Sequence, residues 1–246
     1  MIEYVLFTSG GNDSVALVQH THEKGLKNVA VAYSNTGWAS SWWPLRMQRF
    51  KEWVESYGFV FYEIASEGME ALVDRKSAFP ANGMQFCTTE LKLKPAQQWL
   101  DGIDPEKNAV CMVGIRREES EKRRNWPFLI PDSENHGGRD LLSPLAGHTQ
   151  AERNALLQRG GWKVLPHRSK ECSPCVNLNR ADGRILEEPE IERLERIERK
   201  TGLTMFRVKR FHGATGIREV VRWANSARGK YDPNQISGCD SGMCGN

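Results

Sequence analysis

The stretch Thr8-Ser9-Gly10-Gly11-Asn12-Asp13-Ser14 decides the fold. It follows an apolar run at residues 4–7, which predicts a buried strand, and precedes an apolar run at residues 15–18, which predicts the start of a helix. A Gly-Gly turn between strand and helix lets the backbone approach a ligand closely, and the helix N-terminus offers unpaired N–H groups that attract phosphate. No Gly-Lys-Ser or Gly-Lys-Thr follows, so the loop is not of the Walker type. The alternative is an ordinary turn in which Asp13 caps the helix.

Strands and helices alternate after this loop. The runs at residues 29–33, 59–64 and 109–113 predict strands, and residues 41–57 have the pattern of a helix. This alternation predicts right-handed βαβ units and therefore a parallel sheet. Ligands of such sheets bind at the carboxyl ends of the strands. The turn at Asn35-Thr36-Gly37 is therefore expected to flank the same nucleotide as the loop, with a plain turn at positive φ as the alternative.

Several aromatic and basic residues have two interpretations. Trp42 and Trp43 could stack on a base, although aromatic residues on a helix more often pack in the core. Arg123 and Arg124 are candidates for contacting a polyanionic substrate. The following segment, residues 125–147, is rich in Pro, Gly, Asp and His and predicts an ordered loop.

The composition excludes some classes of protein. Of the 246 residues, 39% are hydrophobic and 26% are charged, which is typical of a soluble globular protein. No apolar run approaches the roughly 20 residues that span a membrane, and no signal peptide is recognisable, so we expect a cytoplasmic protein. A formal charge of +3 permits a nucleic-acid partner without requiring one. Six cysteines in a reducing compartment point to metal binding more often than to disulfides.

Four of these cysteines form two close pairs. Cys172 and Cys175 make a Cys-x2-Cys pair, and Cys239 and Cys244 make a Cys-x4-Cys pair. Four thiolates suit either Zn²⁺ or an iron–sulfur cluster. A redox disulfide remains an alternative for the first pair, and free thiols for both. Cys111 alternates within a predicted strand and is expected to be a buried small apolar residue.

The C-terminal part is predicted to be a smaller, mostly helical region. Residues 187–200 and 216–224 have helical patterns, and Gly202 is a suitable stop for the first of them. We therefore expect one domain over residues 1–147 and a helical, cysteine-clamped region over residues 148–246. Its many basic residues form either a solvated surface or a phosphate-binding face.

Three motifs resemble one family, the PP-loop ATP pyrophosphatases of the phosphoadenylylsulfate (PAPS) reductase-like type. Residues 9–14 match the Ser-Gly-Gly-x-Asp-Ser pyrophosphate loop. Residues 87–95 resemble Cys-Thr-x-x-Leu-Lys-x-x-Pro, and residues 114–120 resemble Gly-Ile-Arg-x-x-Glu-Ser. The resemblance implies an α/β fold with a Rossmann-like, HUP-type parallel sheet. Asn35 stands where the family has the acid of an Asp-Thr-Gly turn.

The resemblance also implies the site. The catalytic residues would be Asp13, Lys92 and Arg116. The planar guanidinium of Arg116 would donate two hydrogen bonds to a phosphate. Mg²⁺ would accompany ATP, with Glu119 or Ser120 as a candidate ligand. The residues expected to bind ATP are Ser9, Gly10, Gly11, Asn12, Asp13, Ser14, Asn35, Thr36, Gly37, Gly114 and Glu119.

The implied reaction is adenylation of a substrate oxygen with release of pyrophosphate, preparing that position for sulfur insertion. The four-cysteine pattern resembles DNA phosphorothioation components and related phage proteins, which implies a nucleic-acid or nucleotide substrate and a sulfur donor such as a cysteine desulfurase. By the same analogy we favour [4Fe-4S] over Zn²⁺. A sulfonucleotide reductase is one alternative, although its Glu-Cys-Gly-(Leu/Ile)-His tail is absent from the sequence. A nucleotide-binding module without catalysis is the other.

Overall fold

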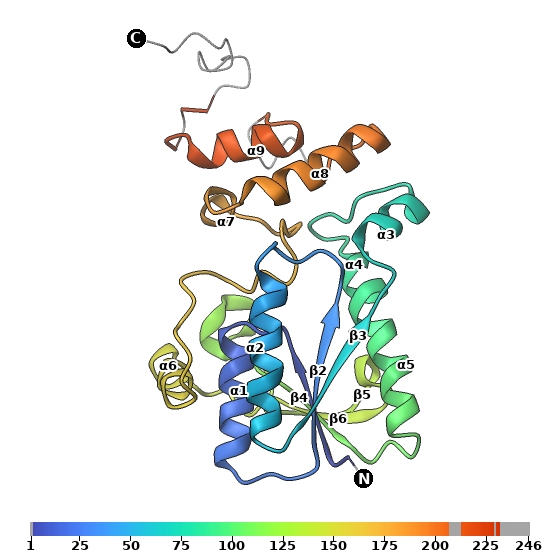
Figure 1. The fold of residues 1–246 in the computed structure, drawn as a ribbon, viewed down its shortest axis with the longest axis vertical. Coiled ribbons are helices and arrows are strands. Elements are labelled where there is room, and N and C mark those ends of the chain that lie inside the picture. Colours follow the sequence, from blue (N-terminus) through green and yellow to red (C-terminus); the bar gives the residue numbers. More distant parts are fainter. Residues whose placement is uncertain (1, 207–212, 229, 232–246) are drawn as a thin grey trace. The chain divides into compact units, whose positions relative to one another are not determined.

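The computed structural model describes residues 2–206, 213–228 and 230–231 (Figure 1). The chain divides into two compact units, which we call the sheet unit (Met1–Leu72 and Phe86–Ser173) and the helical unit (Val73–Gln85 and Pro174–Asn246). The expected division into functional domains after residue 147 stays a prediction, because compactness groups residues by contact and not by activity. Among the described residues, no helix is both long and apolar enough to cross a membrane.

One mostly parallel sheet forms the centre of the sheet unit. Within the described residues its strands lie in the order β3-β2-β1-β4-β6-β5. Every neighbouring pair is parallel except β5 and β6. The α/β, Rossmann-like prediction is therefore confirmed. The strands are β1 (Tyr4–Thr8), β2 (Val29–Asn35), β3 (Val60–Ala65), β4 (Val110–Val113), β5 (Leu129–Ser133) and β6 (Arg139–Leu142).

The hairpin of β5 and β6 corrects the prediction of an ordered loop over residues 125–147, because the segment is ordered but contains two strands. The two strands pair antiparallel, with Ile130 opposite Leu141. A short turn joins them, and such a turn permits only antiparallel pairing. Gly137, with φ of 66°, ends this turn in the left-handed region that favours glycine. The strands are too short, and the register between them too irregular, to produce a recognisable alternation in the sequence.

Helices cover both faces of the sheet (Figure 1). Leu6 of β1 packs in a core cluster with residues of α1, α2 and α6, whereas its neighbour Val5 packs in a second cluster with Leu100 of α5. Successive side chains of a strand point to opposite faces, so a strand covered on both sides reads as continuously apolar. Cys111 is fully buried in the second cluster, as predicted. These helices are α1 (Asn12–Glu23), α2 (Trp43–Ser56), α5 (Lys94–Ile103) and α6 (Gln150–Arg159).

The helical unit is built around α8 (Glu188–Thr201) and α9 (Gly216–Asn225), with the short α7 (Arg180–Arg184). The apolar stripe of α8 is buried as its spacing predicts, and Gly202 ends the helix with φ of 67°. The remaining elements are α3 (Met69–Lys76), α4 (Phe86–Thr88), the π-helical turn η1 (Thr89–Leu93) and the 3₁₀ turns η2 (Arg117–Glu119), η3 (Glu121–Arg123) and η4 (Glu134–His136).

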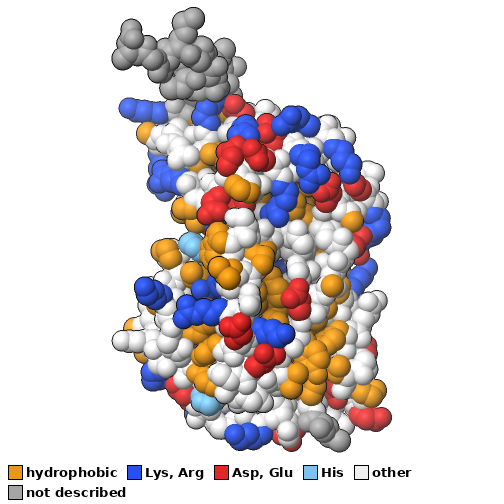
Figure 2. Space-filling model, viewed as in Figure 1, with side chains coloured by type: hydrophobic (Ala, Val, Ile, Leu, Met, Phe, Trp, Pro, Cys, Tyr) orange, Lys and Arg blue, Asp and Glu red, His pale blue; other side chains and the backbone are white. Residues whose placement is uncertain are grey.

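The surface of the helical unit carries both signs of charge. Arg218 pairs with Glu188 at 2.8 Å and with Glu195 at 2.9 Å, and Arg222 pairs with Glu219 at 2.6 Å. Figure 2 shows acidic and basic side chains interspersed over α8 and α9 on the face it presents. At these arginines the structure matches the solvated-surface interpretation. The basic residues at 207–212 lie outside the described residues.

Candidate functional site

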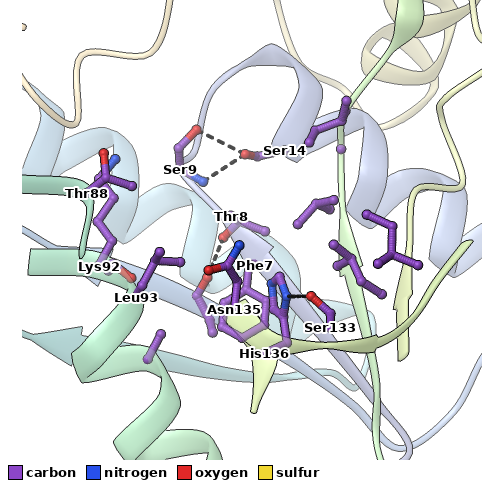
Figure 3. Close-up of a pocket in the computed structure, with 18 of the residues that line it drawn as sticks. Phe7, Thr8, Ser9, Ser14, Thr88, Lys92, Leu93, Ser133, Asn135 and His136 are labelled. Atoms are coloured by element: carbon purple, nitrogen blue, oxygen red, sulfur yellow. Dashed lines mark hydrogen bonds between the residues drawn. The ribbon is translucent and has the colours of Figure 1, made fainter. Parts of the chain in front are cut away.

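A cavity of about 710 Å³ opens at the carboxyl ends of β1 and β4, within the sheet unit. Parallel α/β sheets bind their ligands at this edge. Figure 3 shows side chains from several separate elements around the cavity. The residues of its lining that matter for the site are Ser9, Asp13, Ser14, Ser34, Thr88, Lys92, Gly114, Glu119, Arg123, Ser133, His136 and Glu171. The cavity therefore gathers all three motifs of the sequence.

The loop before α1 is shaped by its own serines. Ser14 Oγ accepts a hydrogen bond from the Ser9 N–H at 2.8 Å and lies 3.2 Å from Ser9 Oγ (Figure 3). Gly10 has φ of 70°, and a Cβ there would lie 2.4 Å from Met47 Sδ. Gly11 is the N-cap of α1, and no described side chain caps the helix. The alternative in which Asp13 caps the helix is therefore not observed, and no described side chain caps the first N–H groups of α1.

Asn12, next in the loop, faces away from the cavity. Its side chain forms two hydrogen bonds of 2.9 Å with the backbone of Leu165, one as donor and one as acceptor. Asn12 thus fastens the loop to the segment after α6 and does not join Ser9 and Ser14 in the lining.

Lys92 reaches the cavity from the π-helical turn η1. Such turns replace a single turn of α-helix and occur frequently at functional sites. Lys92 Nζ lies 2.5 Å from Glu171 Oε1, and both residues line the cavity. Lys94, two residues later, pairs with Glu90 at the surface with 56% of its side chain exposed. The structure thus brings Lys92, but not Lys94, to the cavity.

Arg116 does not line the cavity. Its side chain is only 5% exposed, and its Nε donates to Asp13 Oδ1 at 2.6 Å. Arg153 of α6 approaches the other oxygen of Asp13 to 3.6 Å. The Arg116 guanidinium pairs with the carboxylates of Asp13 and Glu118, and its expected contact with phosphate stays a prediction. Arg116 thus fixes Asp13, which does line the cavity.

Arg123 is the arginine whose side chain lines the cavity. It pairs with Glu119, which also accepts a hydrogen bond from the Arg116 N–H at 2.8 Å. Glu119 and Arg123 form an i,i+4 pair, the spacing at which acid and base meet on one side of a helical turn. Burial lowers the pKa of Arg123, and the charge of Asp13 opposes that change. Glu119 is therefore engaged by Arg123 here, where the sequence suggested a Mg²⁺ ligand.

The turn after β2 supports the site from outside. Ser34 lines the cavity, whereas Asn35 accepts a hydrogen bond from the Gly37 N–H and donates one to Glu63. Thr36 is buried and donates to the backbone oxygen of Glu171 at 3.2 Å. The turn thus positions Glu171 and, through it, Lys92.

His136 and Ser133 were missed in the sequence because they belong to the unrecognised hairpin. His136 Nδ1 lies 2.9 Å from Ser133 Oγ, and the ring packs 5.2 Å from that of Phe7 (Figure 3). Burial, assisted by the charge of Arg139, lowers the pKa of His136 to about 4. The imidazole is therefore neutral at physiological pH and offers a hydrogen-bonding edge without adding charge.

We expect His136→Asn to flatten the pH dependence of stability between about pH 4 and 6.5. The unfolded state takes up a proton near pH 6.5, whereas the folded state does so near pH 4. Within this window the unfolded state binds more protons, so the wild-type free energy of unfolding rises with pH, by about 3 kcal/mol. Urea denaturation at several pH values measures the effect. Parallel curves for the two proteins would show that His136 is not buried as a neutral group.

The cysteines fall partly outside what the structure describes. Cys239 and Cys244 lie outside the described residues. Cys172 and Cys175 are half-buried, and Cys175 Sγ accepts a hydrogen bond from the Asn177 N–H at 3.5 Å. Among the described residues, no group of three or more Cys, His, Asp or Glu could hold a metal ion. The four-cysteine clamp therefore stays a prediction.

Comparison with known proteins gives one family and several distant structures. The family model described as "Phosphoadenosine phosphosulfate reductase domain" matches residues 3–173. Comparison with curated protein sequences finds no match. A PAPS reductase from Candida auris, in a phosphate complex, is 14% identical over 67% of this chain and 75% of its own, with a TM-score of 0.45.

Two further solved structures show similar values. The U34-tRNA thiolase NcsA from Methanococcus maripaludis, with its [4Fe-4S] cluster, is 14% identical over 100% of this chain and 76% of its own, with a TM-score of 0.46. An NH3-dependent NAD synthetase from Campylobacter jejuni, in complex with nitrate, is 16% identical over 82% of this chain and 87% of its own, with a TM-score of 0.41.

Proposed function

Because the chain belongs to the phosphoadenosine phosphosulfate reductase domain family, we propose that its cavity binds MgATP and cleaves it between the α and β phosphates. The observation that carries the proposal is the loop of Ser9 to Ser14, whose residues Ser9, Asp13 and Ser14 line the cavity at the start of α1. The uncapped N–H groups and the positive end of this helix suit the leaving pyrophosphate. A cavity of about 710 Å³ is large enough for a nucleotide.

The reaction proceeds by displacement at the α phosphorus. An acceptor oxygen forms a bond to this phosphorus, and the bond from it to the bridging oxygen of the β phosphate breaks. Pyrophosphate leaves with that electron pair, and the acceptor carries AMP. Lys92 and Arg123 offset the negative charge that collects on the departing oxygens. Asp13, held by Arg116 and Arg153, keeps its place at the loop.

The cations of the cavity are already paired before ATP binds. Lys92 is paired with Glu171 and Arg123 with Glu119. Pairing reduces the cost of holding a charge away from water. A phosphate that enters the cavity exchanges with these carboxylates, so the site is selective for ligands with several negative charges.

We infer that the adenylated acceptor then receives sulfur. The acceptor would be nucleic acid or a nucleotide, as in DNA phosphorothioation, and the sulfur would come from a donor such as a cysteine desulfurase in the cytoplasm. Sulfonucleotide reduction is the second candidate, because the family model carries the name of that activity. The two differ in their first step, since the reductase does not release pyrophosphate from ATP.

The products formed from ATP test the proposal. We expect AMP and pyrophosphate, separated by ion-exchange chromatography, and at least about a tenfold lower rate for Lys92→Met, because a charged hydrogen bond is lost. Lys94→Met is the matched control, since Lys94 lies on the surface near Lys92, and its rate is expected to stay unchanged. ADP and orthophosphate as products would overturn the proposal.

We expect metal to copurify with the protein through Cys172, Cys175, Cys239 and Cys244. Four thiolates would hold [4Fe-4S], giving brown protein, or Zn²⁺, giving colourless protein. Cys172→Ala is expected to lose the metal. Cys111→Ala, which changes a cysteine buried in β4, is expected to retain it. Metal analysis of anaerobically purified protein measures both, and protein without metal would contradict the clamp.

A further inference from the structure

A second hollow lies on the outer side of α2, within the sheet unit. It has a volume of about 480 Å³ and shares no described residue with the nucleotide cavity. We call it the tryptophan–arginine groove. Its lining consists of Trp42, Leu45, Arg46, Gln48, Arg49, Glu52 and Trp162.

Two arginines stand side by side in this groove. The guanidinium carbons of Arg46 and Arg49 lie 4.7 and 4.9 Å from the centre of the Trp162 ring. In the described part of the chain neither arginine has an ion-pair partner, and Arg46 Nη2 is buried without a hydrogen bond. Glu52, the acid of the lining, accepts a hydrogen bond from Gln48. The groove therefore holds two adjacent positive charges that an anion would stabilise.

Burial is the main influence on the charge of Arg46, and its neighbour Arg49 adds to it. Burial, together with the charge of Arg49, lowers the pKa of Arg46 to about 10. Structural arginines are ordinarily placed opposite carboxylates, whereas the half-buried Arg46 donates to the Gly10 oxygen and Arg49 is exposed. An uncompensated pair in a hollow is typical of a binding site for an anion.

The groove also offers apolar and aromatic side chains. Leu45 is 73% exposed, an unusual position for a large apolar side chain. Trp42 is half-buried, and its ring packs at 5.7 Å from that of His167. Its neighbour Trp43 is fully buried and packs in the core, whereas stacking of Trp42 on a base stays a prediction. A ligand that fits the groove combines a planar apolar part with a negative charge.

We propose that the tryptophan–arginine groove binds one nucleotide of a single-stranded nucleic acid, with its base against Trp42 and Leu45 and its phosphate on Arg46 and Arg49. Unpaired bases have accessible faces for such stacking, whereas duplex bases do not. Binding itself is independent of ATP. Its link to catalysis rests on the proposed function. A hydrogen bond of 2.8 Å from Arg46 Nε to the Gly10 oxygen connects the groove to the loop of residues 9–14.

Fluorescence anisotropy of the full chain with a labelled DNA single strand of about 20 nucleotides tests the proposal. In about 50 mM salt we expect Arg49→Gln to raise the Kd roughly tenfold and to reduce the slope of log K against log salt by about 1. Lys51→Gln is the matched control. Lys51 lies on the same helix and pairs with Glu55, and its substitution is expected to change the Kd less than about twofold.

Three results would overturn the proposal. The first is an equal effect of Arg49→Gln and Lys51→Gln, which indicates non-specific attraction. The second is equal affinity for the same sequence as a duplex, and the third is equally effective displacement by an acidic peptide. The assay contains no ATP, so failure here leaves the product assay for ATP unaffected, and the two proposals fail separately.

Discussion

Gly114→Ala is expected to lower the rate of pyrophosphate release from ATP by about a hundredfold. A Cβ at residue 114 would lie 2.7 Å from the Asp13 oxygen and 3.1 Å from the Asp13 carbonyl carbon. Both are backbone atoms, which cannot rotate away as a side chain can. The end of β4 and the phosphate loop must therefore separate, and a displacement of about 1 Å can cost a factor of about 10² in rate. Initial rates with saturating MgATP measure the effect.

Gly102→Ala is the matched control for this substitution. A Cβ at Gly102, in α5, would meet no described atom within 4 Å. We expect an unchanged rate and a gain of about 0.5–1 kcal/mol in the free energy of unfolding, because alanine favours the helix. Equal rates for the two variants would show that the contact of Gly114 with Asp13 does not shape the loop.

Asp13→Ala is expected to lower the free energy of unfolding by about 2–3 kcal/mol and to abolish ATP cleavage. Removing one partner of a buried ion pair costs about 3–5 kcal/mol, because the other charge stays buried. We expect the smaller loss of about 2–3 kcal/mol because the pair is only partly buried. The Asp13 side chain is 33% exposed, whereas the Arg116 side chain is 5% exposed. Arg153, also buried, loses the same partner. Urea denaturation measures the loss of stability.

Glu23→Ala provides the comparison on the same helix. Glu23 pairs with Arg159 at the surface, so its loss is expected to cost no more than about 1 kcal/mol. The double variant Asp13→Ala/Arg116→Met is expected to be more stable than the sum of its single changes, since it removes both charges. Additive losses would contradict a direct pair between Asp13 and Arg116.

The parts of the fold that depend on local patterns were predictable from the sequence. The apolar strands and the Gly-Gly loop are adjacent in the chain, and their periodicity is set by burial on both faces of the sheet. Strands β5 and β6 were not predictable in this way. Their pairing depends on contacts of Ile130 with Leu141 and of Leu141 with Cys111 of β4.

The site was predictable as a set of motifs but not as a geometry. Arg116 follows a strand that ends at the cavity, yet its guanidinium turns toward Asp13, a residue 103 positions earlier in the chain. Nothing in the local spacing specifies this direction. The same holds for Trp42 and Trp43, since neighbouring residues on a helix point about 100° apart and only the packing shows which one is buried.

The pairing of Lys92 with Glu171 has a consequence for the order of events during turnover. Glu171 is bonded directly to Cys172, the first residue of the expected metal clamp. On the proposed function, a nucleotide phosphate that binds Lys92 would displace Glu171, so we expect occupancy of the cavity to be thermodynamically linked to the conformation of this segment. Such linkage is reciprocal. If ATP changes the affinity of this segment for its metal by some factor, the metal changes the affinity for ATP by the same factor. We therefore expect the first measurable effect of losing the metal clamp to be a change in the affinity for nucleotide.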